Sequence, residues 1–271
     1  PRRQRQMCIR DRSFSVSPFM VFTEGMLAWP PDPEAWSIRW YKNMIGDCSA
    51  DVVSSTVPCS TKWMVGTVNS FYIGIIATVI ATALGTLAAL GLSRPHMPYK
   101  GLIMAILISP MIVPLIITAA GMFFFYARIN LVYTFTGVIL AHVALATPFV
   151  VITVTATLVG FDMNMVKAAQ SLGAKPMRTF FKVIMPLILP GIISGALFAF
   201  ITSFDEVVIV MFMASIDQLT IPKQMWAGIR QEISPVILCM ATCLVLLSIF
   251  LLTTVELLRR RSEKLRGIKA R

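Results

Sequence analysis

Two adjacent carboxylates, Asp205 and Glu206, stand inside a run of sequence, residues 186–213, that is otherwise apolar. An ionised carboxylate near the middle of a membrane costs ~2.5–3.5 kcal/mol, so the pair costs roughly 5–7 kcal/mol unless water, a partner group or a cation compensates. Adjacent helical residues point about 100° apart. We therefore expect one carboxylate to face a polar pathway and attract a cation, while the other bonds a neighbouring helix or a partner subunit. The alternative is that both are structural and hold an assembly together.

Three further residues are candidates for the same pathway. Pro110 and Pro114 lie one turn apart in the segment SPMIVP, where they remove two backbone donors and bend the helix. Such bends often line a pathway, although proline is also tolerated in membrane helices for packing alone. His142 is one of only two histidines, and we interpret it as a pore-lining or helix-packing residue rather than a base.

The sequence argues against an enzyme acting within the membrane. It contains no H-E-x-x-H and no Ser or Cys at a recognisable nucleophile spacing, so we expect no catalytic residue and no metal site. It also lacks the phosphate-binding G-x-x-x-x-G-K-[ST]. We therefore expect no nucleotide cofactor on this chain.

The elements that position these residues are membrane helices. Only 14% of the chain is charged and its mean hydropathy is +0.76, whereas a soluble domain carries about 25% charged residues. Apolar runs long enough to span a membrane, which takes ~20 residues, cover 65–92, 101–126, 136–160, 186–213 and 235–258. The runs are continuous rather than alternating, which predicts helices and not barrel strands. The fold class is an all-α polytopic membrane protein with five spans.

The basic residues predict the orientation of these spans. A net charge of +11 could suggest nucleic acid, but, leaving out the five Arg of residues 1–12, thirteen Lys and Arg lie on one side of the spans and six on the other. The thirteen belong to loops 93–100 and 161–185 and to the tail 259–271. By the positive-inside rule these segments and the C-terminus face the cytoplasm, with the tail beside anionic lipid, and no nucleic-acid partner is expected.

Loop 161–185 holds a charged module where a short turn would connect two spans more simply. We predict a first helix capped by Asp162 and ended by Gly173 in the left-handed conformation. Pro176 suits the first turn of a second helix of about eleven residues, ~16 Å long, and Pro186 admits the chain to the membrane. This helix is predicted to have an apolar side of Met177, Phe180, Phe181 and Ile184, with Arg178 and Lys182 more solvated. Two short helices of this size are large enough to fill a groove on another protein.

The module AAQSLGAKPMRTFFKVIMP resembles the "EAA" coupling loop of permease subunits from ATP-binding-cassette importers. That pattern is Glu-Ala-Ala, three residues, Gly, and later an apolar-x-Leu-Pro. Ala168, Ala169 and Gly173 hold the pattern here, and Val183-x-Met185-Pro186 holds it with Met in place of Leu. Lys167 replaces the family's Glu, which reverses the charge offered to an ATPase but leaves the helix-turn-helix shape.

Two other segments, SFDEVVIVMFM at 203–213 and LTIPKQMWAGIRQEISPVI at 219–237, are similar to permeases of spermidine/putrescine-type importers, as is WSIRWY at 36–41. The resemblance implies the type I importer permease fold, which has six spans and its coupling loop between the fourth and fifth. The loop falls between the third and fourth spans here. We therefore expect that a preceding span is missing from this sequence.

The resemblance also implies partners. These are a second permease subunit, a homodimer of ABC ATPase subunits that holds ATP and Mg²⁺, and a periplasmic solute-binding protein, all at a bacterial inner membrane. The implied solute is a polyamine such as spermidine or putrescine. Alternatives are the same importer class with another amine, an amino-acid derivative or an opine, and a secondary carrier that works without an ATPase.

The predicted organisation comprises 1–12, a non-native sequence, then an outward segment 13–64, a permease domain 65–258 and a basic tail 259–271. Residues 1–12, PRRQRQMCIRDR, resemble translated sequencing-adapter sequence, with a native basic arm as the alternative. Cys48 and Cys59 share the outward segment and could form a disulfide in an oxidising periplasm. GIISG at 191–195 is a small-xxx-small pattern, which lets two membrane helices approach closely.

Overall fold

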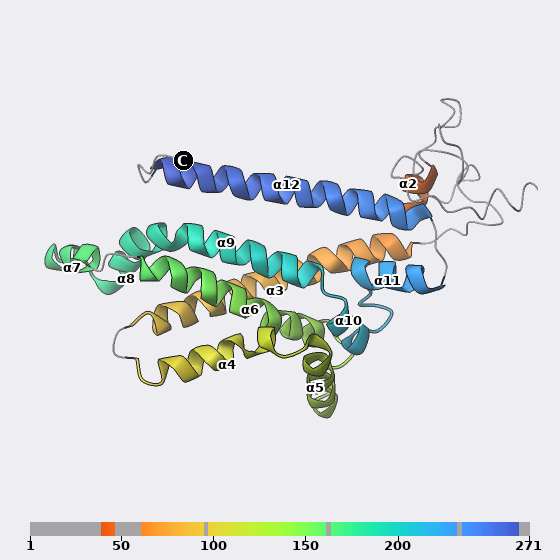
Figure 1. Cartoon of the computed structure of the whole chain (residues 1–271), viewed down its shortest axis with the longest axis horizontal. Coiled ribbons are helices and arrows are strands. Elements are labelled where there is room, and N and C mark those ends of the chain that lie inside the picture. The colour runs from red at the N-terminus through yellow and green to blue at the C-terminus, as the bar shows by residue number, and fades with distance from the viewer. Residues whose placement is uncertain (1–38, 47–60, 95–96, 161–163, 232–234, 266–271) are drawn as a thin grey trace, which may run out of the picture. The chain divides into compact units, whose positions relative to one another are not determined.

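The computed structural model describes residues 39–46, 61–94, 97–160, 164–231 and 235–265, and its regular elements in these ranges are all helices (Figure 1). The chain forms two units, residues 69–218 with 255–271 and residues 1–68 with 219–254. Each unit is described by itself. The predictions for residues 1–12, for Cys48 and Cys59, and for a cap at Asp162 lie outside the described residues.

Four helices in the described ranges are long and apolar enough to cross a membrane, and a bent pair makes a fifth candidate. This agrees with the five predicted spans. The four extend over Lys62–Leu92, Phe135–Val159, Pro176–Phe204 and Val236–Thr254. The runs 65–92, 136–160 and 235–258 are confirmed as α3 (Lys62–Leu92), α6 (Phe135–Val159) and α12 (Pro235–Leu265).

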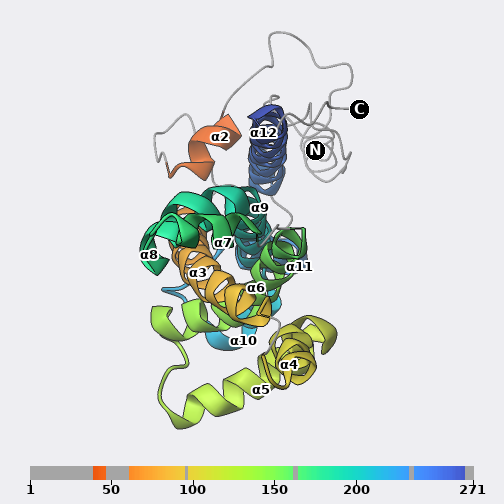
Figure 2. The same cartoon turned by 90° about the vertical axis from the view of Figure 1, so that its left-hand side faces the viewer.

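Helix α6 is the centre of the larger unit. About half of its residues are buried, among them Val138, Val150 and Val154. It packs against α9 (Met185–Phe204), and the two are antiparallel because α7 and α8 connect them at one end (Figures 1 and 2). Helix α3 packs on α6 as well, since a Cβ added to Gly85 would meet the Val150 side chain at 2.7 Å.

The GIISG pattern marks the closest part of the α6 and α9 packing. Gly191 faces Thr157, and Gly195 faces Thr153 and Val150, all on α6. A Cβ on Gly195 would lie 3.0 Å from the Val150 Cα, which is backbone and cannot rotate away. The prediction that these small residues allow close helix approach is confirmed.

The predicted span 101–126 is not one helix. It consists of α4 (Lys100–Ile112) and α5 (Leu115–Arg128), whose axes differ by 103°. Val113 is extended at φ −70° and ψ 135°, and Pro114 begins α5 as its N-cap. The predicted proline bend is thus a full break, because the residue before a proline is driven out of the α conformation.

The predicted span 186–213 is also interrupted. Helix α9 ends at Phe204 and α10 (Val208–Met213) begins after three intervening residues, so Asp205 and Glu206 lie in a break and not inside a continuous helix. The expectation that both carboxylates lie inside one continuous helical span is wrong. The apolar composition of the run does not reveal the break, which Glu206 stabilises by capping α10 as described below.

The predicted second helix of the charged module is not a separate eleven-residue piece. Helix α8 (Pro176–Thr179) continues through a π-helical turn, η3 (Phe180–Ile184), directly into α9. Pro186, expected to separate this helix from the next span, lies in the first turn of α9. Its ring would crowd the carbonyl four residues back, and the wider π turn just before it accommodates the ring without ending the helix.

The smaller unit contains α2 (Arg39–Met44), the start of α3, α11 (Ile221–Gln231) and most of α12. The start of α3 packs on the start of α11, since a Cβ added to Gly66 would lie 3.5 Å from the Ile221 backbone nitrogen. The Arg230 guanidinium lies 5.6 Å from the centre of the Trp226 ring, one turn earlier on α11.

Candidate functional site

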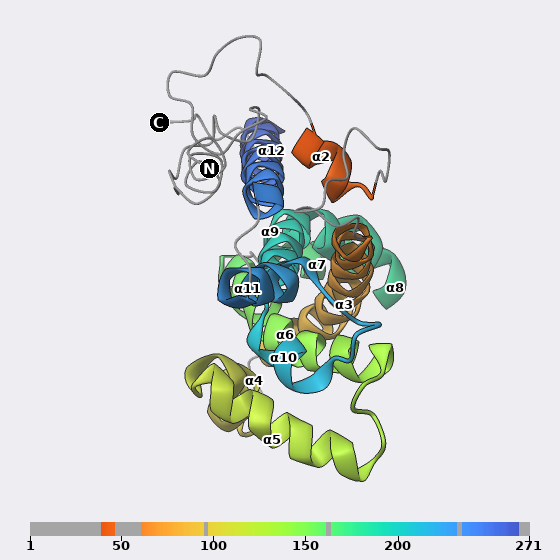
Figure 3. The same ribbon diagram turned by 90° about the vertical axis from the view of Figure 1, so that its right-hand side faces the viewer.

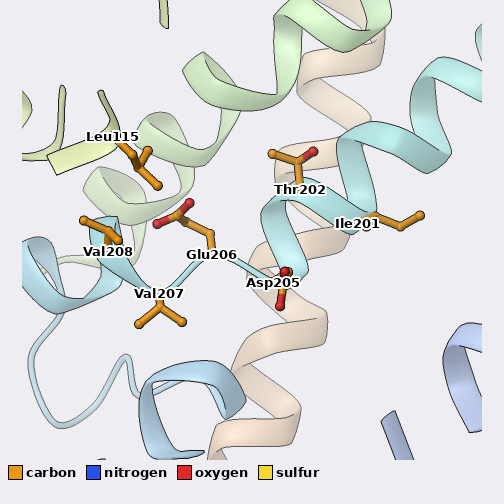
Figure 4. Close-up of a pocket in the computed structure, with 7 residues that line it drawn as sticks. All are labelled: Leu115, Ile201, Thr202, Asp205, Glu206, Val207 and Val208. Atoms are coloured by element: carbon orange, nitrogen blue, oxygen red, sulfur yellow. The ribbon is translucent and has the colours of Figure 1, made fainter. Parts of the chain in front are cut away.

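The break between α9 and α10 borders a pocket of about 410 Å³. Its lining has two carboxylates, one hydroxyl and four apolar side chains, and comprises Leu115, Ile201, Thr202, Asp205, Glu206, Val207 and Val208 (Figure 4). None of these lining residues is basic. Because α6 and α9 are antiparallel, the pocket lies at the end of this helix pair opposite to α7 and α8, where α10 packs beside α5 (Figure 3). The pocket lining is therefore acidic and lies at one end of this helix pair.

The two carboxylates have different environments. Glu206 is only 7% exposed, and its Oε1 accepts a hydrogen bond of 2.9 Å from the Ile209 amide in the first turn of α10. Asp205 is exposed, and its amide donates to the Ile201 carbonyl at 3.0 Å as the C-cap of α9. Their carboxyl groups point in different directions from the connecting segment (Figure 4). Glu206 therefore makes the capping bond, whereas the Asp205 side chain is exposed.

The other predicted pathway residues are not part of the pocket lining. Pro114 precedes the lining residue Leu115 and sets the start of α5, whereas Pro110 lies inside α4. His142 is buried in α6, where its Nδ1 lies 2.8 Å from the Ser203 Oγ on α9. This burial agrees with the helix-packing interpretation of His142. A pathway role for these three residues stays a prediction.

Sequence reasoning named only Asp205 and Glu206 among the residues that line the pocket and missed the other five, of which Thr202 and Leu115 are the most informative. Thr202 stands three residues before Asp205, which is the spacing of neighbours on one helix face. This spacing could have identified Thr202 from the sequence as a neighbour of Asp205. Leu115 comes from α5, and no feature of a single sequence indicates that α5 folds across to α10.

The corner between α7 (Asn164–Ser171) and α8 is a Schellman motif. Gly173 has φ +80°, its amide donates to the Gln170 carbonyl at 2.9 Å, and the Ala174 amide donates to the Ala169 carbonyl at 3.1 Å. These are the two bonds that end a helix in a left-handed glycine. Pro176 opens α8 as predicted. The corner that the sequence predicted is confirmed, and Ala169 takes part in it directly.

The coupling segment, residues 164–184, offers both apolar and basic side chains at its surface. Leu172, Met177 and Phe181 are exposed, while Phe180 and Ile184 are partly buried. Arg178 and Lys182 are exposed as predicted, and so are Lys167 and Ala168. The segment between two long helices therefore exposes large apolar side chains and basic side chains together.

A family comparison defines the class of protein. Residues 60–264 match the family described as "Binding-protein-dependent transport system inner membrane component". This match covers most of the chain, including all of the long helices, the pocket and the coupling segment. The chain belongs to this family, so it is a multi-span component of an inner-membrane transport system and not an enzyme, as the sequence analysis predicted.

Within this class the chain is similar to permeases of known name. It is 30% identical to the "Spermidine/putrescine transport system permease protein PotC" of Haemophilus influenzae over 72% of this chain and 76% of that protein. It is 28% identical to PotC of Escherichia coli K12, over 72% and 74%. It is 29% identical to the "Putrescine transport system permease protein PotI" of the same organism, over 76% and 72%.

Solved structures of ATP-binding-cassette transporters share the fold. A bacterial ABC transporter involved in the import of the acidic polysaccharide alginate aligns with a TM-score of 0.64 and 13% identity, covering 83% of this chain and 81% of that chain. The MetNI methionine ABC transporter, in inward-facing conformations, aligns with a TM-score of 0.55 and 19% identity, over 80% and 100%. The predicted importer permease fold is therefore confirmed.

Proposed function

We propose that this chain is a permease subunit of an ATP-driven importer for a small cationic solute, a polyamine such as spermidine or putrescine. The observation that carries this proposal is the pocket lined by Asp205 and Glu206 without any basic residue. A solute with several ammonium groups supplies the cation that compensates a carboxylate in apolar surroundings. The names of the similar permeases, which transport spermidine and putrescine, support the same solute class.

The family places other components of a transport system beside this chain. We infer that these are a second permease subunit, two copies of one ATPase and a periplasmic binding protein that delivers the solute. ATP and Mg²⁺ belong to the ATPase, because this chain has no phosphate-binding G-x-x-x-x-G-K-[ST]. The exposed apolar surface of the coupling segment is the surface that we assign to the ATPase.

The mechanism follows from the antiparallel pair α6 and α9. The coupling segment lies at one end of this pair and the acidic pocket at the other. Helix α8 continues into α9 without a loop. A displacement of α8 by the closing ATPases is therefore transmitted along one continuous helix to the break at Asp205. Opening and closing of the pocket is thereby linked to ATP hydrolysis.

Replacing Asp205 with Asn tests the solute class. The substitution removes the open negative charge at the pocket and keeps the size of the side chain, so we expect uptake of radiolabelled spermidine or putrescine to fall roughly fivefold to tenfold. Glu206→Gln retains an oxygen that can accept the bond from Ile209, and we expect a smaller loss. The measurement is initial uptake in cells that contain the whole importer.

Asp217 provides the matched control, since it is exposed but does not line the pocket. Asp217→Asn removes the same charge and should leave uptake unchanged. Complex assembly is checked by co-purification of the ATPase. Normal polyamine uptake in both pocket variants, or failure of both to assemble, contradicts a cation-attracting pocket and favours a purely structural role for the two carboxylates.

The orientation is a separate proposal, based on thirteen basic residues on one side of the spans against six on the other. We infer that the coupling segment and the C-terminus are cytoplasmic. A phosphatase fused after Arg271 should be inactive and a fluorescent protein fused there should be bright. Ser60→Cys should react with an impermeant thiol reagent from outside. Reaction of this cysteine only in inverted vesicles would overturn the orientation.

A further inference from the structure

One side-chain hydrogen bond connects the two central helices deep in the larger unit. His142 on α6 is 1% exposed and Ser203 on α9 is 5% exposed, and the His142 Nδ1 lies 2.8 Å from the Ser203 Oγ. The hydroxyls of Thr147, Thr153 and Thr157 on α6 donate to carbonyls of their own helix. The Ser203 hydroxyl instead joins a residue 61 positions away in the chain.

The position of this bond is close to the pocket. Ser203 is in the last turn of α9, between the pocket residue Thr202 and the break that begins at Asp205. Beyond the break, a hydrogen bond holds the end of α10 beside the residues that precede α6. The Tyr133 amide donates to the Met213 carbonyl at 2.9 Å. Hydrogen bonds therefore hold the chain on both sides of the break. The bond between His142 and Ser203 holds the chain before the break, and the bond between Tyr133 and Met213 holds it after the break.

Burying a histidine at position 142 is energetically unfavourable, and packing alone does not explain its presence there. Its Nε2 is buried without a hydrogen-bond partner among the residues that the structure describes. A leucine at this position would fill comparable space without an unpaired nitrogen, and the freed Ser203 hydroxyl could turn to a carbonyl of its own helix. The histidine is therefore unfavourable for packing, and what it adds is the directional bond to Ser203.

We propose that His142 is a positioning residue, which holds the last turn of α9 through Ser203 so that Thr202 and Asp205 keep a fixed place at the pocket. The consequence for transport rests on the proposed function, since it matters only if a solute passes Asp205. The consequence for geometry does not depend on the solute. The two can therefore be measured separately.

The geometric experiment places a cysteine at the pocket. In the full importer, with the five native cysteines replaced by alanine, Asp205→Cys is labelled with an impermeant thiol reagent. We expect His142→Leu to change the labelling rate by roughly threefold or more, because a buried hydrogen bond that holds the helix end is lost. His142→Asn should restore the original rate, since its amide occupies the place of Nδ1.

His142→Gln is the matched control, because its amide occupies the place of Nε2 and does not reproduce the bond to Ser203. We expect His142→Gln and Ser203→Ala to behave like His142→Leu, and the double variant His142→Leu with Ser203→Ala to be no worse than either alone. An unchanged labelling rate in His142→Leu overturns the positioning role. So does an equal change in His142→Leu and His142→Asn.

Uptake is then measured in the same His142 variants with native Asp205. His142→Leu should assemble with its ATPase and lose roughly fivefold in polyamine uptake, whereas His142→Asn should stay within about twofold of the native chain. Loss of assembly in His142→Leu assigns a merely structural role to the histidine and overturns the proposal. If Asp205→Asn leaves uptake normal, the proposed function fails, but the labelling result still decides the role of His142.

Discussion

Gly195→Leu is expected to prevent the permease from accumulating in the membrane. A side chain at Gly195 would meet the Val150 Cα of α6 at 3.0 Å and the Thr153 hydroxyl closer still. Backbone on a neighbouring helix cannot rotate away, so the two central helices must separate. Overpacking typically costs about 1–3 kcal/mol, and a four-carbon side chain at a backbone contact lies at or beyond the upper end. Because stability is about 5–15 kcal/mol in total, we expect a large loss of folded protein.

The measurement is the amount of monodisperse protein after extraction in mild detergent. Gly121→Leu is the matched control, since Gly121 is in α5 and a Cβ there meets nothing within 4 Å. Gly195→Ala should give an intermediate yield. A native yield of Gly195→Leu would show that α6 and α9 do not pack through this face in the membrane.

Ala169→Asp is expected to abolish transport while the membrane helices still insert. Ala169 is partly buried in the coupling segment, and its carbonyl accepts the bond that closes the corner at Gly173. A charged side chain there disturbs the packing of α7 on α8 and brings an unpaired charge into the surface that we assign to the ATPase. An unpaired charge at a protein interface costs several kcal/mol, so we expect a loss of uptake of about tenfold or more.

Two readouts separate uncoupling from misfolding. The amount of Ala169→Asp in the membrane should match the native chain, whereas uptake and its coupling to ATP hydrolysis should be lost. Gln170→Asp introduces the same charge at the next, exposed residue and should retain most of the transport. If Ala169→Asp co-purifies its ATPase and transports normally, the ATPase contacts a different part of the chain.

Much of this protein was determined by its sequence alone, and these features share a local cause. The long helices follow from continuous apolar runs, because a chain in lipid must satisfy its backbone groups within the same segment. The corner of the coupling segment follows from Gly173 and Pro176, which act through their own backbone angles. The presence of an acidic pair in apolar surroundings was also readable from residue types.

Only the tertiary structure decided how the acidic pair is used. The break at residues 205–207 depends on Glu206 capping α10, on α10 packing beside α5, and on Met213 bonding back to Tyr133. Local composition does not encode these contacts, because an apolar run has the same hydropathy whether or not it is broken. The same holds for the 103° angle between α4 and α5. The partnership of His142 with Ser203 joins residues 61 positions apart, and packing of α6 on α9 alone brings them together.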